Sequence, residues 1–351
     1  GEYTAFHGGT VALALAAQVT TMNRVNGIYM REMAIFMEIV ANNDMLIYTN
    51  SATDPYSNNS AGALINEIQT ECDNTIGAGN YDIGHAFYEI PSSGGISGSG
   101  IAGLGVVCNS SAKATGWSGC GGAYTNSIWM AIFAHEVGHQ FNATHSFYGT
   151  SNFCSGSARS VGNGVEPGSG NSLMSYQGIC GAAGSCDNQN ITPNSNFLYF
   201  HGHSIEQIEN FVSDTLSCFT TTSTGNSPPV ITMPASQTIP KETPFYLSAS
   251  VSDPDGDPLL TSWEEIDTDN LPLSCPDGAP NDAATSTTAP LFRSFDPSTG
   301  GNIRYFPKMS DILDDTQTMG EILAEVGRNI NMRCTARGID ANGISGVTYE
   351  D

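Results

Sequence analysis

Three histidines and one glutamate lie within one short stretch of this sequence, at a spacing that suits a metal ion. His135 and His139 are four residues apart, so on a helix both imidazoles lie on one face and can bind the same ion. Glu136 projects about 100° further round the helix, beside the ion, where a general base for a metal-activated water is needed. The spacing therefore predicts a helical metal site with hydrolytic chemistry.

The third histidine, His145, requires that helix to end. A straight continuation would carry it roughly 9 Å along the axis from His139, out of reach of the ion. Asn142 lies between them, and Asn tolerates the left-handed conformation that ends a helix and turns the chain back. Three His ligands leave the fourth position of a tetrahedral zinc open for water, which is typical of a catalytic site. The alternatives are a chance match or a structural site.

This segment resembles the metzincin metalloendopeptidases, whose pattern is His-Glu-x-x-His-x-x-Gly-x-x-His, with Asn142 at the usual glycine. A second stretch, Ser172-x-Met174-Ser175-Tyr176, is similar to the metzincin turn in which a Met lies beneath the zinc. By this resemblance Met174 gives the imidazoles an apolar, polarizable floor; otherwise it would be core filling. Tyr176 matches a Tyr that binds zinc or donates to the oxyanion in astacin-like and serralysin-like relatives, although reprolysins generally lack it.

The stretch Gly100–Cys108 is predicted to be a strand punctuated by glycines, which let another backbone approach closely. In metzincins the corresponding edge strand lines the cleft and pairs with extended substrate. By position, the resemblance gives this substrate-binding role to Gly103, Leu104 and Gly105. The alternative is the end of a Gly-rich loop without a binding role.

Other polar residues near these motifs are expected to be structural. Glu166 could replace a third His, as in gluzincins, but the Pro-Gly that follows it does not suit a ligand on a helix. His85 lies on a predicted strand and is expected to be packed. His201 and His203 are left structural because the ligand set is already complete.

Length and charge limit the possible partners. With 351 residues the chain is expected to form two domains, and no apolar run is long enough to span a bilayer. A net charge of −24, with only 11 basic residues, argues against nucleic acid or an anionic membrane as a partner. We expect a monomer that acts on protein or peptide substrates. The chain begins at Gly1 without an initiator Met or a signal peptide, which suggests a processed mature form.

Nine cysteines in a polar, Gly/Ser/Asn-rich sequence indicate an oxidising setting, so we expect a secreted, extracellular protein with disulfide bonds. Buried thiols are the alternative. The pairing cannot be derived from the sequence alone. The predicted bonds are Cys154–Cys180, Cys108–Cys218 and Cys275–Cys334, and the odd count leaves at least one Cys outside them.

Apolar periodicity gives the expected order of elements. Helices are predicted over Val11–Ile28, over Ala61–Ile76, over Asn126–Phe141 and after the capping box Ser204–Gln207. Strands are predicted over Glu32–Val40, Met45–Tyr48 and Tyr81–Phe87. Strands that alternate with helices before the metal helix indicate an α/β subdomain.

The composition changes after residue 219. Residues 220–229 are rich in Thr, Ser and Asn and read as a linker. Residues 230–351 carry short strands with turn signals and are interpreted as an all-β, immunoglobulin-like sandwich. The chain stops where such a sandwich still needs its last strand, so this form is expected to be truncated. Because no catalytic motif lies in this region, we expect it to be dispensable for peptide-bond chemistry.

Three carboxylates in the second region could hold a second metal. Asp253, Asp255 and Asp257 stand at alternate positions and offer the hard oxygen ligands that calcium prefers. The same residues are equally good turn formers. We therefore consider calcium as a second cofactor beside zinc.

The fold class is α+β: a metzincin catalytic domain over 1–219, with a twisted mixed sheet, helices and an irregular lower subdomain, followed by the sandwich. The pattern is most similar to the reprolysin-like (adamalysin-type) branch, in particular secreted bacterial members with a C-terminal immunoglobulin-like domain. The resemblance implies a zinc endopeptidase that hydrolyses extracellular proteins, with Glu136 as general base. The competing function is an extracellular adhesion or binding protein with a structural zinc, which would give Glu136 no role.

Overall fold

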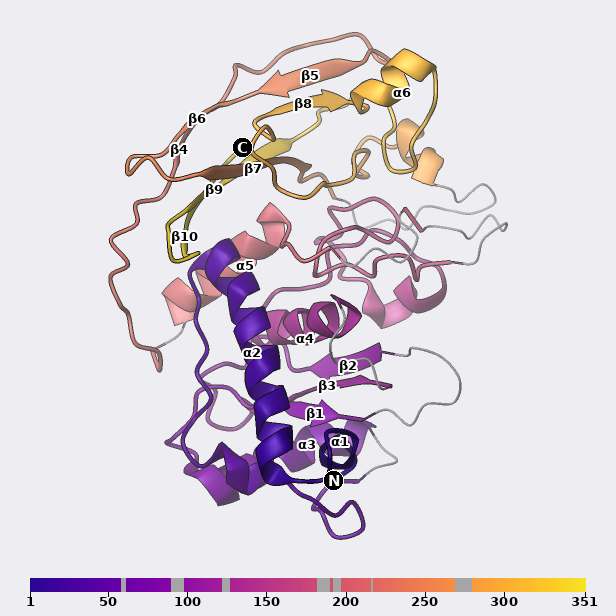
Figure 1. The fold of residues 1–351 in the computed structure, drawn as a ribbon. Helices are drawn as coiled ribbons and strands as arrows, with labels where there is room; N and C mark the ends of the chain where they lie inside the picture. The colour runs from indigo at the N-terminus through magenta and orange to yellow at the C-terminus, as the bar shows by residue number, and fades with distance from the viewer. Residues whose placement is uncertain are drawn as a thin grey trace. The chain divides into compact units, whose positions relative to one another are not determined.

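The computed structural model describes residues 1–57, 61–89, 98–121, 127–181, 190–191, 197–215, 217–268 and 280–351 (Figure 1). By their internal contacts these residues divide into two compact units. The first unit comprises residues 1–30, 35–143 and 207–222. The second unit comprises residues 31–34, 144–206 and 223–351.

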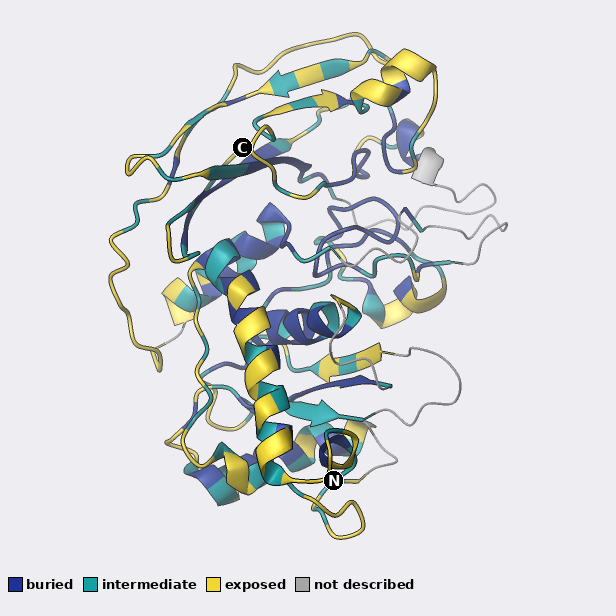
Figure 2. Ribbon diagram, in the orientation of Figure 1, coloured by how far each residue is buried: buried dark blue, intermediate teal, exposed yellow. Residues whose placement is uncertain are grey.

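The first unit contains a three-stranded sheet of order β1-β3-β2. Strand β1 (Ala86–Tyr88) runs parallel to β3 (Gly116–Cys120), and β2 (Gly98–Ala102) runs antiparallel to β3. The helices of this part of the chain are α1 (Glu2–Phe6), α2 (Val11–Met33), α3 (Ala61–Cys72) and α4 (Ser127–Gln140). Most of helix α4 is buried, because nine of its 14 residues are classed as buried (Figure 2). A helix of this kind is an interior element and not an amphipathic surface helix.

Helix α2 begins at Val11 as predicted but continues to Met33, so the predicted strand Glu32–Val40 is wrong. Ala34 takes a left-handed conformation, with φ 53°, directly after the helix. Residues 35–40 after it belong to no helix or strand. The side-chain amide of Asn26 donates to the carbonyl of Met37 (2.8 Å) and accepts from its N–H (2.9 Å). These bonds satisfy the backbone groups that a strand ladder would otherwise engage.

The other predictions for this unit hold in part. The predicted strand Met45–Tyr48 is wrong, because a 3-10 helix covers Asn43–Leu46 after a left-handed Asn42. Helix α3 starts at Ala61 as predicted, and a π turn continues it over Asp73–Gly77. Of the predicted strand Tyr81–Phe87, only the end coincides with β1.

The second unit combines an irregular segment with short antiparallel strands. Within 144–201, the described residues have only two helical turns, Asn152–Cys154 and Gly156–Ala158. One sheet has the order β10-β9-β7, and the pairs β4-β6 and β5-β8 are also antiparallel. The strand bounds are β4 Val230–Thr232, β5 Phe245–Ser248, β6 Ser250–Ser252, β7 Leu259–Glu265, β8 Ile303–Phe306, β9 Met332–Ile339 and β10 Ser345–Glu350. Two helical segments, Pro280–Thr285 and α6 (Met309–Asp314), complete this region.

One apolar cluster of the second unit combines residues of the irregular segment and of the C-terminal region. Trp263 of β7, Phe292 and Phe306 are almost fully buried in it. Tyr148, from the irregular segment, belongs to the same cluster. Residues 144–206 therefore share a core with the C-terminal strands. The predicted domain bounds at 219 and 230 and the immunoglobulin-like assignment both stay predictions.

Helix α5 (Gly202–Thr215) begins two residues before the predicted capping box, so Ser204 lies inside the helix. The physical reason is a tertiary contact. The carboxylate of Glu264 on β7 accepts the N–H of Gly202 (2.9 Å) at the start of the helix, which a local capping side chain would otherwise do.

Two of the predicted disulfide bonds are confirmed. Cys108 pairs with Cys218 in the first unit, and Cys154 pairs with Cys180 in the second. Cys275 lies outside the described residues, so its pairing with Cys334 stays a prediction.

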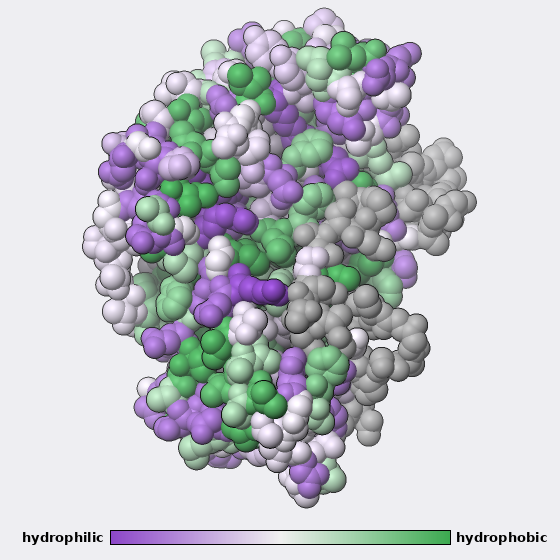
Figure 3. Space-filling view, in the orientation of Figure 1, coloured by the Kyte–Doolittle hydropathy of each residue, from purple (hydrophilic) through white to green (hydrophobic). Residues whose placement is uncertain are grey.

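The surface mixes polar and apolar side chains over the face drawn in Figure 3. Within the described ranges, no helix has the length and apolar character needed to cross a membrane.

Candidate metal centre

The metal site is built on the end of helix α4. The helix ends at Gln140, and Asn142 takes the left-handed conformation, with φ 74°. The N–H of Asn142 donates to the carbonyl of His139 (2.8 Å), and that of Ala143 donates to Gly138 (2.9 Å). This is the Schellman pattern of helix termination. The prediction that Asn142 turns the chain back is confirmed.

The turn brings the three predicted ligands together. A ring nitrogen from each of His135, His139 and His145 lies within 4.8 Å of the other two. The Nδ1 atom of His139 lies 2.7 Å from the carbonyl oxygen of Ala143, and that of His145 lies 2.5 Å from the carbonyl oxygen of Ala158. These bonds orient both rings, as second-shell partners of metal-binding histidines do in zinc proteins. The donor set fits zinc.

The two backbone carbonyls that orient the rings could not be identified from sequence. A carbonyl is offered by every residue, so no residue type signals the role. Only the path of the chain after His145 brings the oxygen of Ala158 to the imidazole.

Glu136 is buried beside the ligands, with 7% of its surface exposed. Burial raises the pKa of its carboxyl group to about 8 in the metal-free chain. A divalent cation next to the carboxylate would favour the charged form and lower this pKa again. A Cβ at Gly100 of β2 would lie 2.6 Å from Oε1 of Glu136, so the absence of a side chain there gives the carboxylate its space.

Strand β2 has no strand neighbour on its outer side among the described strands. The N–H of Gly103 donates to the carbonyl of Thr115 (2.7 Å), which continues the β2–β3 register. Because bonded pairs alternate along an antiparallel ladder, Gly98, Gly100 and Ala102 direct their N–H and C=O groups away from β3. The open edge of the sheet therefore runs past Glu136.

This geometry corrects the predicted strand Gly100–Cys108, because the strand ends at Ala102 and turns follow. The N–H groups of Gly103 and Gly105 are already engaged with Thr115 and His139. They cannot donate to a substrate as well. Leu104 is half-exposed, at 52%, and its predicted role in substrate binding is not tested.

The turn after β2 instead caps helix α4. Gly105 (φ 62°) donates its N–H to the carbonyl of His139 (2.9 Å), and Val106 donates to that of Gln140 (2.9 Å). A Cβ on Gly105 would lie 2.8 Å from Oδ1 of Asn142. The glycine therefore serves the helix end that carries the second ligand.

Met174 lies in a tight turn, in which the N–H of Ser175 donates to the carbonyl of Ser172 (3.1 Å). Met174 is fully buried, and its carbonyl accepts the N–H of Ser146 (3.0 Å), the residue after the third ligand. The ring of Tyr176 packs edge-on against that of His145, with 4.6 Å between centroids. The turn and the third ligand are thus in direct contact.

A family model of metallo-peptidase family M12B, reprolysin-like, matches residues 1–210, which is more than half of the chain. The chain belongs to this family. No match was found among curated proteins. As an M12B peptidase it is a zinc metalloendopeptidase, and His135, His139 and His145 fit the zinc. The competing interpretation as a binding protein with a structural zinc is therefore set aside.

His85 is packed as predicted. Its Nδ1 lies 2.7 Å from Oε1 of Gln140, and its Nε2 lies 2.9 Å from the hydroxyl of Ser118. Both ring nitrogens are engaged, so His85 of this M12B peptidase has a structural role next to Gln140 of α4 and is not a metal ligand.

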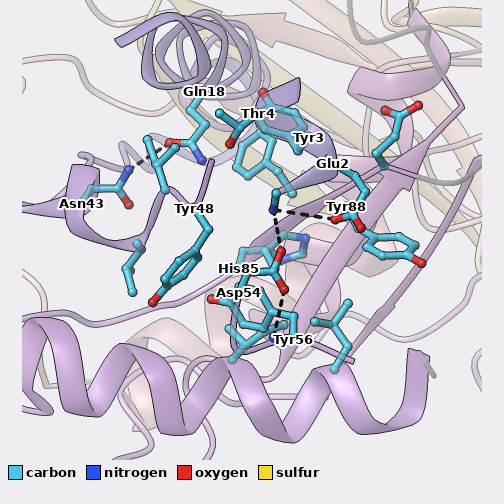
Figure 4. A pocket seen from close by; sticks show the side chains of 18 of the residues that line it. Glu2, Tyr3, Thr4, Gln18, Asn43, Tyr48, Asp54, Tyr56, His85 and Tyr88 are labelled. Atoms are coloured by element: carbon cyan, nitrogen blue, oxygen red, sulfur yellow. Dashed lines mark hydrogen bonds and ion pairs between the residues drawn. The ribbon is translucent and has the colours of Figure 1, made fainter. Parts of the chain in front are cut away.

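A cavity of about 100 Å³ in the first unit is lined by residues of α1, α3, β1 and the segments between them (Figure 4). The amino group of Gly1 lies 2.7 Å from Oδ2 of Asp54 there. None of the three ligands lines this cavity, so it is not part of the metal centre.

The predicted calcium ligands are close together in the second unit. Carboxylate oxygens of Asp253, Asp255 and Asp257 lie within 4.8 Å of one another. Oδ1 of Asp253 accepts the N–H groups of Asp255 (2.9 Å) and Asp257 (3.1 Å), which is the alternative turn chemistry. Both interpretations place the carboxylates in this way, and calcium stays a prediction.

Proposed function

We propose that this zinc metalloendopeptidase is secreted and hydrolyses peptide bonds of extracellular proteins, with Glu136 as its general base. One observation carries the proposal. Glu136 lies buried on α4 between His135 and His139 and next to the open edge of β2. Two disulfide bonds support an oxidising, extracellular setting.

Zinc, when bound by the three histidines, supplies Lewis-acid polarisation of a water molecule and of the scissile carbonyl. The carboxylate of Glu136 accepts a proton from the attacking water as its oxygen bonds to the carbonyl carbon. The same carboxyl group then donates that proton to the leaving nitrogen as the peptide bond breaks. The two influences on this carboxyl group suit the two steps: the bound cation favours the charged form that accepts the proton, and burial favours the protonated form that donates it.

Substrate is proposed to bind in an extended conformation along β2. The outward N–H and C=O groups of Gly98, Gly100 and Ala102 can pair with a peptide by strand addition. Leu104, half-exposed just beyond the strand, keeps its proposed contact with the substrate. Tyr176, which packs against His145, is the candidate donor to the developing oxyanion.

The test is Glu136→Gln in the purified chain. The amide keeps the size of the side chain but cannot accept the proton, so hydrolysis of a peptide should fall roughly 10²-fold or more. Zinc content should stay at one ion per chain, because Glu136 is not a ligand. A variant with near-normal turnover would exclude Glu136 as the base.

A further inference from the structure

The carboxylate of Glu166 in the second unit accepts five hydrogen bonds. It is fully buried. It accepts hydrogen bonds from the hydroxyl of Ser146 (2.6 Å), the N–H of Asn171 (2.7 Å), and both the N–H (3.0 Å) and the hydroxyl of Ser172. A further bond comes from the hydroxyl of Ser294 (3.0 Å). One carboxylate therefore joins three separate segments of the chain.

Two of these segments belong to the metal centre. Ser146 directly follows the third ligand, and Asn171 and Ser172 begin the turn that carries Met174. The two segments are also joined directly, since the N–H of Ser146 donates to the carbonyl of Met174 (3.0 Å). Glu166 therefore links the turn of Met174 to the loop that carries His145.

The third segment comes from the C-terminal region. Ser294 has 1% of its surface exposed, and its hydroxyl also lies 2.7 Å from the phenol oxygen of Tyr199. Its carbonyl accepts from the side-chain amide of Asn171 (2.8 Å). The neighbouring Arg293 donates to Oδ1 of Asn171 (2.6 Å) and to the carbonyl of Ile191 (2.9 Å).

The same region is fixed to residues 198–206 by buried charges. Arg333 of β9 donates to the carbonyl of Gly202 (3.1 Å) and to the carboxylate of Glu206 (2.8 Å). Arg337 of β9 donates to the carbonyl of Phe200 (3.1 Å). Arg333 and Arg337 are buried, so separating these segments would leave their charges without these partners, which is strongly destabilising.

We propose that Ser294 is a positioning residue of the zinc site, which acts through Glu166 on the Met174 turn and on the loop of His145. The C-terminal region is then an integral part of the peptidase, contrary to the expectation from sequence that it is dispensable. The inference concerns the metal site of the proposed peptidase but does not depend on Glu136 being the base. Zinc affinity, not turnover, is therefore its main readout.

The experiment compares Ser294→Ala with Ser262→Ala in the full chain. Ser262 is a matched control, because it is buried on β7 and its hydroxyl has no hydrogen-bond partner among the described residues. Zinc affinity is measured by competition with a chelator, and the ligand geometry by the visible absorption spectrum of the Co²⁺-substituted protein. Ser294→Ala should weaken zinc binding roughly 10-fold, at the lower end of the range for outer-shell partners, and should shift the Co²⁺ bands. Ser262→Ala should change neither.

If Ser294→Ala does not fold, Tyr199→Phe carries the same test, because it removes only the phenol oxygen, which is bonded to Ser294 (2.7 Å) and accepts a longer bond from the side-chain amide of Asn171 (3.4 Å). A smaller fall in zinc affinity of the same sign is expected. Wild-type affinity and an unshifted Co²⁺ spectrum in a folded variant would overturn the proposal. An equal fall in Ser294→Ala and Ser262→Ala would also overturn it, since it would indicate a general loss of packing.

Discussion

Two stretches of the chain position the predicted metal ligands by different physical means. In the first unit, α4 carries His135, Glu136 and His139 as a nearly all-buried helix against β2 and β3. In the second unit, His145 and Met174 lie on irregular chain that is fixed by a disulfide bond, backbone hydrogen bonds and the buried carboxylate of Glu166. Apolar packing of regular elements positions the first set of residues, whereas polar bonds between distant segments position the second.

The difference implies that the residues on α4 and the residues on the irregular chain respond differently to substitution. A buried helix tolerates the loss of one side chain near its end, because its other residues keep their packing contacts. When one member of a buried polar network is removed, its former partners are left without a hydrogen bond. The segments that they held together then lose their fixed positions.

The largest contrast is expected between His139→Ala and His145→Ala. Each removes one of three ligands, so each should weaken zinc binding by more than the roughly 10–100-fold typical of outer-shell changes. His139→Ala should leave the circular dichroism of the helix unchanged. His145→Ala should also expose the loop of 145–158, which limited proteolysis would detect. Equal protease resistance in the two variants would contradict the comparison.

The two disulfide bonds offer the next contrast. A disulfide bond stabilises the fold by reducing the chain entropy of the unfolded state. This relation gives a stabilisation of about 5 kcal/mol for Cys108–Cys218, whose cysteines are 110 residues apart, and about 3.5 kcal/mol for Cys154–Cys180, whose cysteines are 26 apart. Paired Cys→Ala variants are compared by denaturant unfolding.

Zinc affinity should show the opposite order. Cys154 and Cys180 pack with Phe147 and Tyr176, and both rings contact His145. Loss of this bond should weaken zinc binding, whereas loss of Cys108–Cys218 should not. A fall in zinc affinity confined to the Cys108–Cys218 variant would contradict the assignment of roles.

The features that could be predicted from the sequence are those that depend on a single helix, and the features that could not depend on contacts between distant segments. The ligands, Glu136 and the left-handed Asn142 could be predicted because they depend on spacing within one helix and its end. The true extent of β2 could not, because it is set by pairing with β3, which lies further along the chain. The role of Glu166 as a link to Ser294 was also missed, since the two residues are 128 positions apart.

Within the first unit, Gly100→Ala tests how closely strand β2 packs against Glu136, the proposed general base. The new Cβ would meet the carboxyl carbon of Glu136 at 2.6 Å, so the carboxylate must move. Because a misplacement of about 1 Å can cost 10²-fold in rate, kcat should fall by roughly 10–10², with zinc content unchanged. Gly98→Ala is the control, since its Cβ would collide with the flexible end of Ile132 (1.9 Å) and otherwise make ordinary contacts with Ile132 and Ile128. Equal losses in both variants would indicate disturbance of the strand and not of the base.

The last comparison concerns two buried histidines, one in each unit. Burial lowers the pKa of His85 to about 4, and burial lowers that of His203 to about 4 as well. Since an unfolded chain has His pKa values near 6.5, it binds more protons than the folded chain between these values. The stabilisation from each neutral histidine is therefore complete above pH 6.5 and is lost as the pH falls toward 4, by at most about 1.4 kcal/mol per pH unit.

The variants His85→Gln and His203→Gln remove the titration, so each should flatten the loss of stability with acid. Denaturant unfolding between pH 7 and 4 measures the slope, and the difference from wild type cancels the release of zinc at low pH that both proteins share. If the two units unfold in separate transitions, His85→Gln should flatten only the first unit's transition and His203→Gln only the second's. Parallel curves for wild type and both variants would show that neither histidine is held neutral by its surroundings.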